Sequence, residues 1–335
     1  MKAYRTGTGA EAGLQWVDLA PRALGAHEVR VRMQAVSLNY RDVMVASGHY
    51  PVAVGQPILA SDGAGEVVEV GSEVSRFRVG DRVVTTFFQD WASGPQPARA
   101  ELTALGAAID GVLAEEVVLG EQGLLPVPAH FNARQAATLP VAGVTAWTSL
   151  FVHGGARPGD TVLLLGTGGV SIWALQLAKA AGLRVIITSS SDDKLAQARA
   201  LGADRTVNYR RHPEWQDEVL KLTDGLGADL TVEVGGAGTL PRSIAATRVG
   251  GTIALVGVLT GMGESINPLP LLIGAKRLQG VLVGSREHQE QLQRFVATSG
   301  LAPVIDRVFP FAQAPEALAY LKSGQHFGKV LIEIG

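Results

Sequence analysis

A glycine-rich turn is the segment of the sequence whose chemistry is easiest to infer. The turn, Gly166-Thr167-Gly168-Gly169, follows a short apolar run, Thr161–Leu165, and precedes Ser171–Ala181, where apolar residues recur at helical spacing. Glycines between a strand and a helix permit a tight turn and let backbone N–H groups approach a pyrophosphate at the positive end of the helix. Ser171 stands where the third glycine of this fingerprint is usual. The context predicts a dinucleotide-binding turn.

A serine cluster follows the next predicted strand, Arg184–Thr188. Ser189 to Ser191 stand there, with Lys194 shortly after, where an NAD site usually has an acidic residue for the ribose 2′-hydroxyl. Hydroxyls and a cation suit a 2′-phosphate, so the sequence favours NADP. In a second interpretation, a serine or Asp192 caps the helix from Asp193, with Lys194 on its solvated face. Both interpretations can hold together, and Asp192 keeps NAD possible.

The elements around these residues change character along the chain. The first third predicts short strands such as Glu28–Ala35, in which polar and apolar side chains alternate. Residues 87–111 show no clear period and predict a long loop. After Pro128, strands and helices alternate, which predicts βαβ units and a parallel sheet. The tail, Lys329–Ile334, predicts a strand late enough to return to the first domain.

Composition narrows the class of protein. The 335 residues favour two domains at roughly 150 residues each. With 29 Lys and Arg against 31 Asp and Glu, no basic excess favours nucleic-acid binding. Absent cysteine excludes disulfides, thiolate-bound zinc and a cysteine nucleophile. The uncharged run Thr161–Ala178 is split by the glycine turn, so we expect no membrane span, and the N-terminus shows no apolar signal segment, so we expect a cytoplasmic protein.

Over nearly its whole length the sequence resembles the medium-chain dehydrogenase/reductase superfamily. Within it, the sequence is most similar to the zinc-independent branch near quinone oxidoreductases and NADP-dependent alcohol dehydrogenase-like proteins. The matching segments include Asn39-Tyr40-Arg41-Asp42, the glycine turn and the closing Gly328-Lys329-Val330. The resemblance implies an α/β protein with a β-rich GroES-like catalytic domain, residues 1–127 and 280–335. It also implies a Rossmann domain with a doubly wound parallel sheet, residues 128–279, that binds NADP. The active site would lie in the cleft between the two domains.

The resemblance also implies roles for individual residues. Thr145 would lie against the nicotinamide. The residues that would line the pyrophosphate are Gly168, Gly169 and Val170. Those that would bind the 2′-phosphate are Ser190, Ser191, Lys194 and Tyr209. Two further segments would lie on either side of the nicotinamide and its carboxamide. Their residues are Gly257, Val258, Val283 and Gly284.

The chain departs from the zinc-dependent members of the superfamily at the metal site. Asn39 stands at the position of their first cysteine ligand, and Ser61-Asp62 stands in place of a His-Glu pair. We therefore expect no zinc. Without a Lewis acid, hydrogen-bond donors must stabilise the charge that hydride transfer leaves on a substrate oxygen. The principal candidates are Asn39 and Tyr50, although a turn asparagine and a loop-packing tyrosine would look the same in sequence.

The leading hypothesis is a zinc-independent, NADPH-dependent oxidoreductase that transfers hydride to quinones or α,β-unsaturated carbonyls, because conjugation delocalises the developing charge. A metal-free NADP-dependent alcohol dehydrogenase is the first alternative, and a non-catalytic NADPH-binding regulatory protein is the second. A small-molecule carbonyl substrate is the expected partner. The resemblance further implies a homodimer that pairs edge strands within residues 267–283.

Overall fold

The structure is a computed structural model that describes residues 1–7, 13–52, 55–261, 263 and 266–335. The chain divides into two compact units. The β-rich unit comprises Met1–Val144 and Val283–Gly335, and the parallel-sheet unit comprises Thr145–Leu282. Among the described residues, no helix has the length and apolar character needed to cross a bilayer.

The β-rich unit is built on a sheet with the order β14-β15-β3-β4-β5-β7, in which β6 also pairs with β3. Its strands are β3 (Glu28–Leu38), β4 (Asp62–Val70), β5 (Arg82–Thr85), β6 (Glu116–Gly120), β7 (Leu124–Pro126), β14 (Ile305–Pro310) and β15 (Lys329–Glu333). A separate hairpin joins β1 (Lys2–Gly7) to β2 (Gly13–Asp18). Apolar side chains of β3, including Val29, Val31 and Met33, form a buried core with residues of the other strands.

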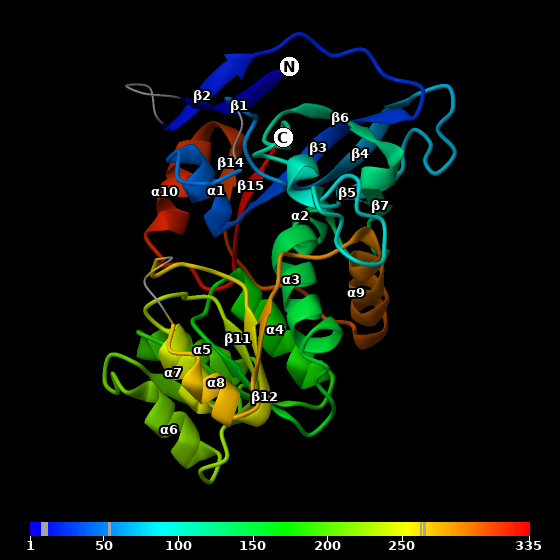
Figure 1. The fold of residues 1–335 in the computed structure, drawn as a ribbon. Coiled ribbons are helices and arrows are strands. Elements are labelled where there is room, and N and C mark those ends of the chain that lie inside the picture. The colour runs from blue at the N-terminus through cyan, green and yellow to red at the C-terminus, as the bar shows by residue number, and fades with distance from the viewer. Residues whose placement is uncertain (8–12, 53–54, 262, 264–265) are drawn as a thin grey trace. The chain divides into compact units, whose positions relative to one another are not determined.

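The two ends of the chain meet in this unit, as the sequence predicted. β15 pairs antiparallel with β3, so the red C-terminal strand lies beside a blue N-terminal one (Figure 1). The helices of the unit are α1 (Tyr40–Ala46), α2 (Ala133–Ala136), α9 (Arg286–Ser299) and α10 (Ala314–Lys322), and the wider helical turns of Leu139–Gly143 follow α2.

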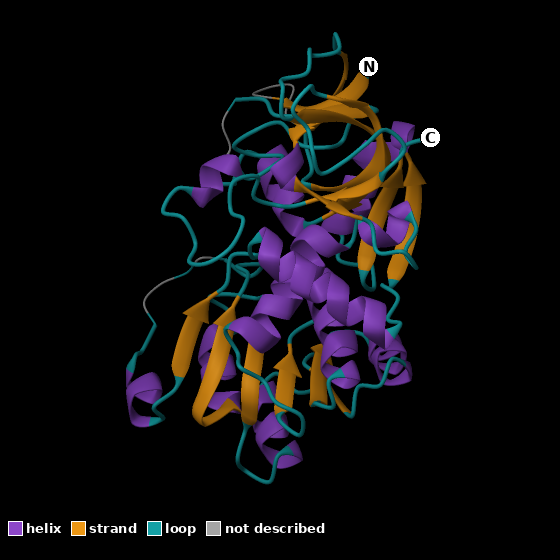
Figure 2. Ribbon diagram, turned by 90° about the vertical axis from the view of Figure 1, so that its right-hand side faces the viewer, coloured by secondary structure: helices purple, strands orange, loops and turns teal. Residues whose placement is uncertain are grey.

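The parallel-sheet unit has six strands in the order β10-β9-β8-β11-β12-β13, all parallel. They are β8 (Thr161–Leu164), β9 (Arg184–Ser189), β10 (Arg205–Asn208), β11 (Ala228–Glu233), β12 (Thr247–Leu255) and β13 (Arg277–Gly280). Helices connect them: α4 (Gly169–Ala180), α5 (Asp192–Ala200), α6 (Trp215–Leu222), α7 (Leu240–Ala246) and α8 (Leu269–Ile273). Figure 2 shows these strands side by side with helices against them. This confirms the predicted alternation and the α/β fold class.

The division between the units differs from the boundaries expected from the sequence. It falls after Val144 and before Val283, whereas residues 127 and 280 were expected. Residues 128–144 belong with the β-rich unit because α2 packs on β3 and β4, and because the Val141 N–H donates to Asp62 Oδ2 at 3.1 Å. The short helix α3 (Val144–Trp147) crosses the boundary, and the helical turn Thr148–Val152 continues it.

Candidate functional site

The glycine turn lies at the centre of the parallel sheet. β8 pairs with β9 on one side and with β11 on the other, so the chain leaves β8 where the strand order reverses. Ligands of open α/β sheets bind at this kind of switch point. Gly166 has φ +71°, a left-handed conformation that favours glycine, and Gly168 is extended just before α4 begins.

The N-terminus of α4 fits an anionic ligand. No side chain of the described residues caps it, and Ser171 Oγ instead donates to the Leu165 carbonyl at 2.7 Å. The N–H groups of the first turn, at Gly169 and Val170, therefore keep their positive end for a ligand. The glycine turn and this helix end together have the donor chemistry that a pyrophosphate requires.

The serine cluster adjoins β10. The register pairs Asn208 with Ser189, so Ser190 and Tyr209 leave neighbouring strands at the same edge. The Tyr209 N–H donates to the Ser189 carbonyl at 3.1 Å, and Ser191 Oγ accepts from the Lys194 N–H at 3.4 Å. Ser191 is the N-cap of α5, so the capping interpretation holds and the helix begins at Asp192. The residues predicted to bind the 2′-phosphate are thus brought to one corner.

Asp192 and Arg211 form an ion pair at this corner. Asp192 accepts from Arg211 and, at 2.9 Å, from Asn208 Nδ2. The carboxylate that kept an NAD interpretation open is therefore already paired. Arg211 is an exposed side chain, and the turn after β10 brings it to Asp192.

The residues expected near the nicotinamide lie at constrained backbone positions. Thr145 is buried, and its carbonyl accepts from Thr148 Oγ1 at 3.2 Å. A Cβ on Gly257 would approach the Val234 carbonyl oxygen to 2.5 Å, so that position requires glycine. Val283 has φ +53°, a costly conformation for a β-branched residue.

The two remaining members of this set lie beside them in the chain. Val258 follows Gly257 and is 38% exposed. Gly284 follows Val283 and is buried just before Ser285, the N-cap of α9.

A buried polar cluster lies where β3, β4 and β15 meet in the β-rich unit. The register pairs Val330 with Leu38 and Asp62 with Ser37, which brings Lys329, Asn39 and Asp62 to one end of the sheet. Lys329 Nζ donates to the Leu38 carbonyl at 2.7 Å and to Asn39 Oδ1 at 2.6 Å. Lys329 is 3% exposed, so this cation lies inside the protein.

Two carboxyl groups face this cation from neighbouring elements. Asp62 Oδ1 accepts from Ser61 Oγ at 2.7 Å, and Asp42 Oδ2 accepts from the Asn39 N–H at 2.8 Å. Both aspartates are fully buried. Asn39, Ser61 and Asp62, which stand where the sequence comparison expected metal ligands in zinc-dependent members, therefore share one buried cluster with Asp42 and Lys329.

Burial controls the protonation of the cluster. Loss of water raises the pKa of Asp42 to about 6, against the opposing effects of Arg41 and the Asn39 N–H. Burial also raises the pKa of Asp62, although Lys329, Asn39 and Ser61 oppose the increase. Burial lowers the pKa of Lys329, which the two aspartates counteract. The groups depend on one another for their charged forms, so they act as one unit.

Tyr50 and Arg41 extend the cluster. The Arg41 guanidinium carbon lies 5.0 Å from the centre of the Tyr50 ring and 4.9 Å from that of Phe87. Its Nη1 lies 3.3 Å from Asp42 Oδ1. The structure therefore links Asn39 and Tyr50 through Asp42 and Arg41. Sequence reasoning missed Arg41 and Lys329 as site residues, although both lie in the quoted family motifs.

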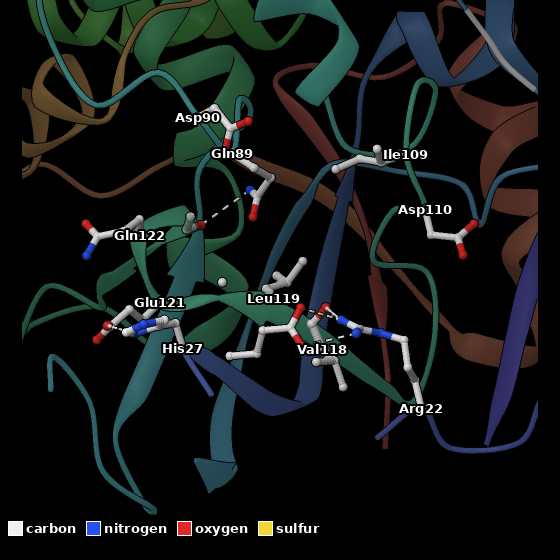
Figure 3. A pocket seen from close by; sticks show the side chains of 13 residues that line it. Arg22, His27, Gln89, Asp90, Ile109, Asp110, Val118, Leu119, Glu121 and Gln122 are labelled. Carbon is white, nitrogen blue, oxygen red and sulfur yellow. Dashed lines mark hydrogen bonds and ion pairs between the residues drawn. The ribbon is translucent and has the colours of Figure 1, made fainter. Parts of the chain in front are cut away.

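Within the described ranges, no group of three or more His, Cys, Asp and Glu side chains has an arrangement that could hold a metal ion. A surface pocket of about 530 Å³ opens elsewhere in the β-rich unit (Figure 3). His27 lies in it, 3.2 Å from Glu73, and Arg22 pairs there with Glu28. None of the predicted site residues lines this pocket.

Comparison with known proteins identifies both halves of the chain. Residues 25–129 match the alcohol dehydrogenase GroES-like domain, and residues 169–298 match the zinc-binding dehydrogenase family. A zinc-type alcohol dehydrogenase-like protein of Schizosaccharomyces pombe is 41% identical, with 94% of this chain and 93% of that protein aligned. A quinone oxidoreductase of Pseudomonas aeruginosa is 37% identical over 76% of this chain and 71% of its own length.

Solved structures share the whole fold. A protein from Sinorhizobium meliloti 1021, described as an alcohol dehydrogenase, superposes with a TM-score of 0.93 at 42% identity, covering 99% of this chain and 98% of that one. An NAD-dependent alcohol dehydrogenase superposes with a TM-score of 0.89 at 36% identity, with both chains fully covered. The 2-octenoyl-CoA carboxylase reductase CinF, in complex with NADP and 2-octenoyl-CoA, superposes with a TM-score of 0.87 at 26% identity. The superposition covers 99% of this chain and 87% of CinF.

The matched domains, the full-length relatives and the dinucleotide-binding turn lead to one conclusion. The chain is an oxidoreductase that belongs to the medium-chain dehydrogenase/reductase superfamily.

Proposed function

We propose that the protein is a zinc-independent reductase that uses NADPH to reduce quinones or α,β-unsaturated carbonyl compounds. The observation that carries the cofactor choice is the corner formed by the ends of β9 and β10. Ser190, Lys194 and Arg211 offer hydroxyls and positive charge there, and Asp192 is paired with Arg211 and Asn208. A 2′-phosphate would gain donors at this corner, whereas a free ribose hydroxyl would find its usual acceptor already occupied.

Most of the remaining cofactor contacts lie in the same unit, and two of them, Val283 and Gly284, belong to the β-rich unit. Gly168, Gly169 and Val170 would hold the pyrophosphate at the N-terminus of α4, while Ser191 and Tyr209 would complete the 2′-phosphate site. The residues that would bracket the nicotinamide are Thr145, Gly257, Val258, Val283 and Gly284. When bound, the cofactor supplies the hydride and its electron pair.

The substrate class follows from the side chains of the buried cluster. Asn39 and Ser61 are poor ligands for zinc, and Lys329 already bonds Asn39 Oδ1. Asn39 would act through its remaining amide donors and Tyr50 through its phenol, as hydrogen-bond donors near the substrate oxygen. A delocalised anion needs less stabilisation than a localised alkoxide, so neutral donors of this kind suffice for it. CinF, similar in fold to this chain, was solved with NADP and an α,β-unsaturated thioester, which supports the same class.

Steady-state assays test this proposal. We expect NADPH to reduce 2-cyclohexenone and 1,4-naphthoquinone at rates well above those of primary alcohols oxidised with NADP⁺. Fluorescence titration should show tighter binding of NADPH than of NADH. Tighter NADH binding would contradict the cofactor choice, which matters because one similar structure is described as an NAD-dependent alcohol dehydrogenase. Tight NADPH binding without turnover on any carbonyl would favour a regulatory role.

We also propose that the protein forms a homodimer through the β13 edge of the parallel sheet. β13 is the last strand in the sheet order. The neighbouring helix α8 exposes apolar side chains: Leu272 is 78% exposed and Ile273 is 75% exposed. A second copy of this chain would cover that surface and pair its own β13 with the open strand edge.

A further inference from the structure

The Arg41 guanidinium lies over two aromatic rings. Its side chain is 9% exposed, and its guanidinium carbon lies about equally far from the rings of Tyr50 and Phe87, at 5.0 and 4.9 Å. Phe87 is itself buried. Stacking of this kind fixes the plane of a guanidinium and limits the conformational entropy it loses when it binds a ligand.

One edge of this guanidinium has no hydrogen-bond partner. Nη1 faces Asp42 Oδ1 at 3.3 Å, but Nε and Nη2 are buried and bond no described residue. Among the arginines of the described ranges, Arg41 is the one with two such nitrogens. The N–H groups at Nε and Nη2 share one edge of the planar group and point in parallel, so both can reach one acceptor. A buried donor without a partner destabilises the protein, and a bound acceptor would remove that cost.

The charges around Arg41 favour an acceptor that is neutral when it binds. Arg41 and Lys329 carry positive charge, and Asp42 and Asp62 carry negative charge, so the fully ionised cluster is balanced. A permanent anion would leave this buried cluster with an excess negative charge. A carbonyl oxygen avoids that cost in the ground state and gains attraction as negative charge develops on it.

We propose that Arg41 is a catalytic residue whose Nε and Nη2 donate to the carbonyl oxygen of an α,β-unsaturated substrate. The inference rests on the proposed function. Hydride from NADPH forms a C–H bond at the β-carbon, and the alkene electrons move toward the carbonyl to give an enolate. Arg41 stabilises the enolate oxygen. A proton from solvent then bonds to the α-carbon and restores the carbonyl group, leaving the saturated ketone and NADP⁺.

Substitution of Arg41 tests this role with two substrates that differ in how much their anions need stabilisation. In Arg41→Gln we expect kcat for 2-cyclohexenone to fall about 100-fold, the usual cost of one oxyanion donor. We expect a smaller loss, about tenfold, with 1,4-naphthoquinone, because the anion of a reduced quinone is aromatic and less basic than an enolate. Arg41→Lys, which keeps the charge but lacks the two-donor edge, should lie between wild type and Arg41→Gln.

A second arginine stacked on aromatic rings provides the matched control. Arg307 lies over the rings of Phe309 and Tyr320, with centroid distances of 5.7 and 4.3 Å. Arg307→Gln should leave both rates and the ratio between the two substrates unchanged. Thermal melting and the NADPH dissociation constant, measured for every variant, separate loss of folding or of cofactor binding from loss of catalysis.

Binding of 4-nitrophenol gives a readout that needs no turnover, because its phenolate carries a negative oxygen on a planar conjugated frame, as an enolate does. With and without NADP⁺, wild type should lower the pKa of bound 4-nitrophenol, measured by absorbance, and Arg41→Gln should not. If wild type reduces neither carbonyl compound, the proposed function fails, and this titration alone decides the role of Arg41. Equal losses with both substrates, together with unchanged phenolate binding in Arg41→Gln, would overturn the inference.

Discussion

Lys329 and Arg211 are side chains whose roles depend on partners far away in the sequence. Lys329 lies 290 residues from Asn39, yet its ammonium bonds that amide inside the protein. Arg211 pairs with Asp192 across the ends of two neighbouring strands. In each case a positive charge neutralises or orients a polar group that the sequence alone presents as free.

Arg211 should contribute to the choice between the two nicotinamide cofactors. We predict that Arg211→Ser weakens NADPH binding about tenfold, because a charge-assisted hydrogen bond contributes roughly 1.5–3 kcal/mol. NADH binding should stay the same or tighten, since Asp192 becomes free to accept from a ribose hydroxyl. Fluorescence titration of both cofactors measures this, with Arg210→Ser as the neighbouring control. Equal weakening of NADH and NADPH would contradict the role.

Asp42 should make folding stability depend on pH. The pKa of this carboxyl is raised from 3.8 to about 6 in the folded protein. Between about pH 4 and 6 the folded state therefore binds more protons there than the unfolded chain. The contribution of Asp42 to the free energy of unfolding is therefore complete below this window. It decreases as pH rises through the window, by up to about 3 kcal/mol.

The substitution Asp42→Asn tests this dependence while keeping an oxygen that can accept from the Asn39 N–H. We expect urea unfolding between pH 4 and 6 to show a smaller loss of stability with rising pH than in wild type. Glu69→Gln, on an exposed carboxylate that pairs with Arg30, is the control and should keep the wild-type slope. An unchanged slope in Asp42→Asn would exclude this carboxyl as the cause.

At the scale of elements, strand register assembles both parts of the candidate site. β15 pairs with the end of β3, and β4 begins opposite Ser37, so three strand ends surround Asn39. In the parallel-sheet unit, the ends of β8, β9 and β10 lie at one edge because parallel strands point the same way. The positions of the turns and helix N-termini that follow these strands are therefore set by the sheets.

Gly166 should be required by this arrangement at the end of β8. With φ +71°, an alanine there is expected to cost about 1 kcal/mol of stability and to disturb the turn that precedes α4. Gly155 is a matched control, because its φ is +60° and, as at Gly166, no atom lies within 4 Å of an added Cβ. It precedes β8, at the opposite end of the strand.

We predict that Gly166→Ala and Gly155→Ala lose similar stability in urea unfolding, but that only Gly166→Ala weakens NADPH binding, by tenfold or more. Isothermal titration of both variants checks the difference. If both variants bound NADPH as tightly as wild type, the turn would not be the phosphate site.

At the scale of the whole molecule, each unit has its own core and its own open surface. The sheet of the β-rich unit includes strands from both ends of the chain, and in the parallel sheet β13 is one of the two edge strands. An unpaired strand edge beside exposed apolar residues favours association with another chain. This surface is the physical basis of the proposed homodimer.

The substitution Leu272→Glu should weaken this association. A charge in an apolar interface must lose its hydration, so we expect the wild-type dimer to become a monomer at micromolar concentration. Leu226→Glu is the control, since Leu226 is 73% exposed between α6 and β11, and it should leave the mass unchanged. Light scattering measures both variants. A monomeric wild type would end the proposal.

The sequence by itself determined the local pattern. Alternation in Glu28–Ala35 identified β3 correctly, and the strand, glycine turn and helix around Gly166 identified the dinucleotide-binding unit. These features depend on near neighbours in the chain, because side-chain periodicity and backbone freedom are local properties. The roles of the residues proposed for the phosphates were implied by the family resemblance, which these local motifs carry in part.

Only the tertiary structure decided which distant groups meet. β3 continues to Leu38, beyond the predicted strand, because both of its faces are buried near β15 and the alternation ends there. The pairing of Lys329 with Asn39 and the stacking of Arg41 on Phe87 depend on register between segments far apart in the chain. Long-range register is set by burial of whole sheets, so no local pattern in the sequence reports it.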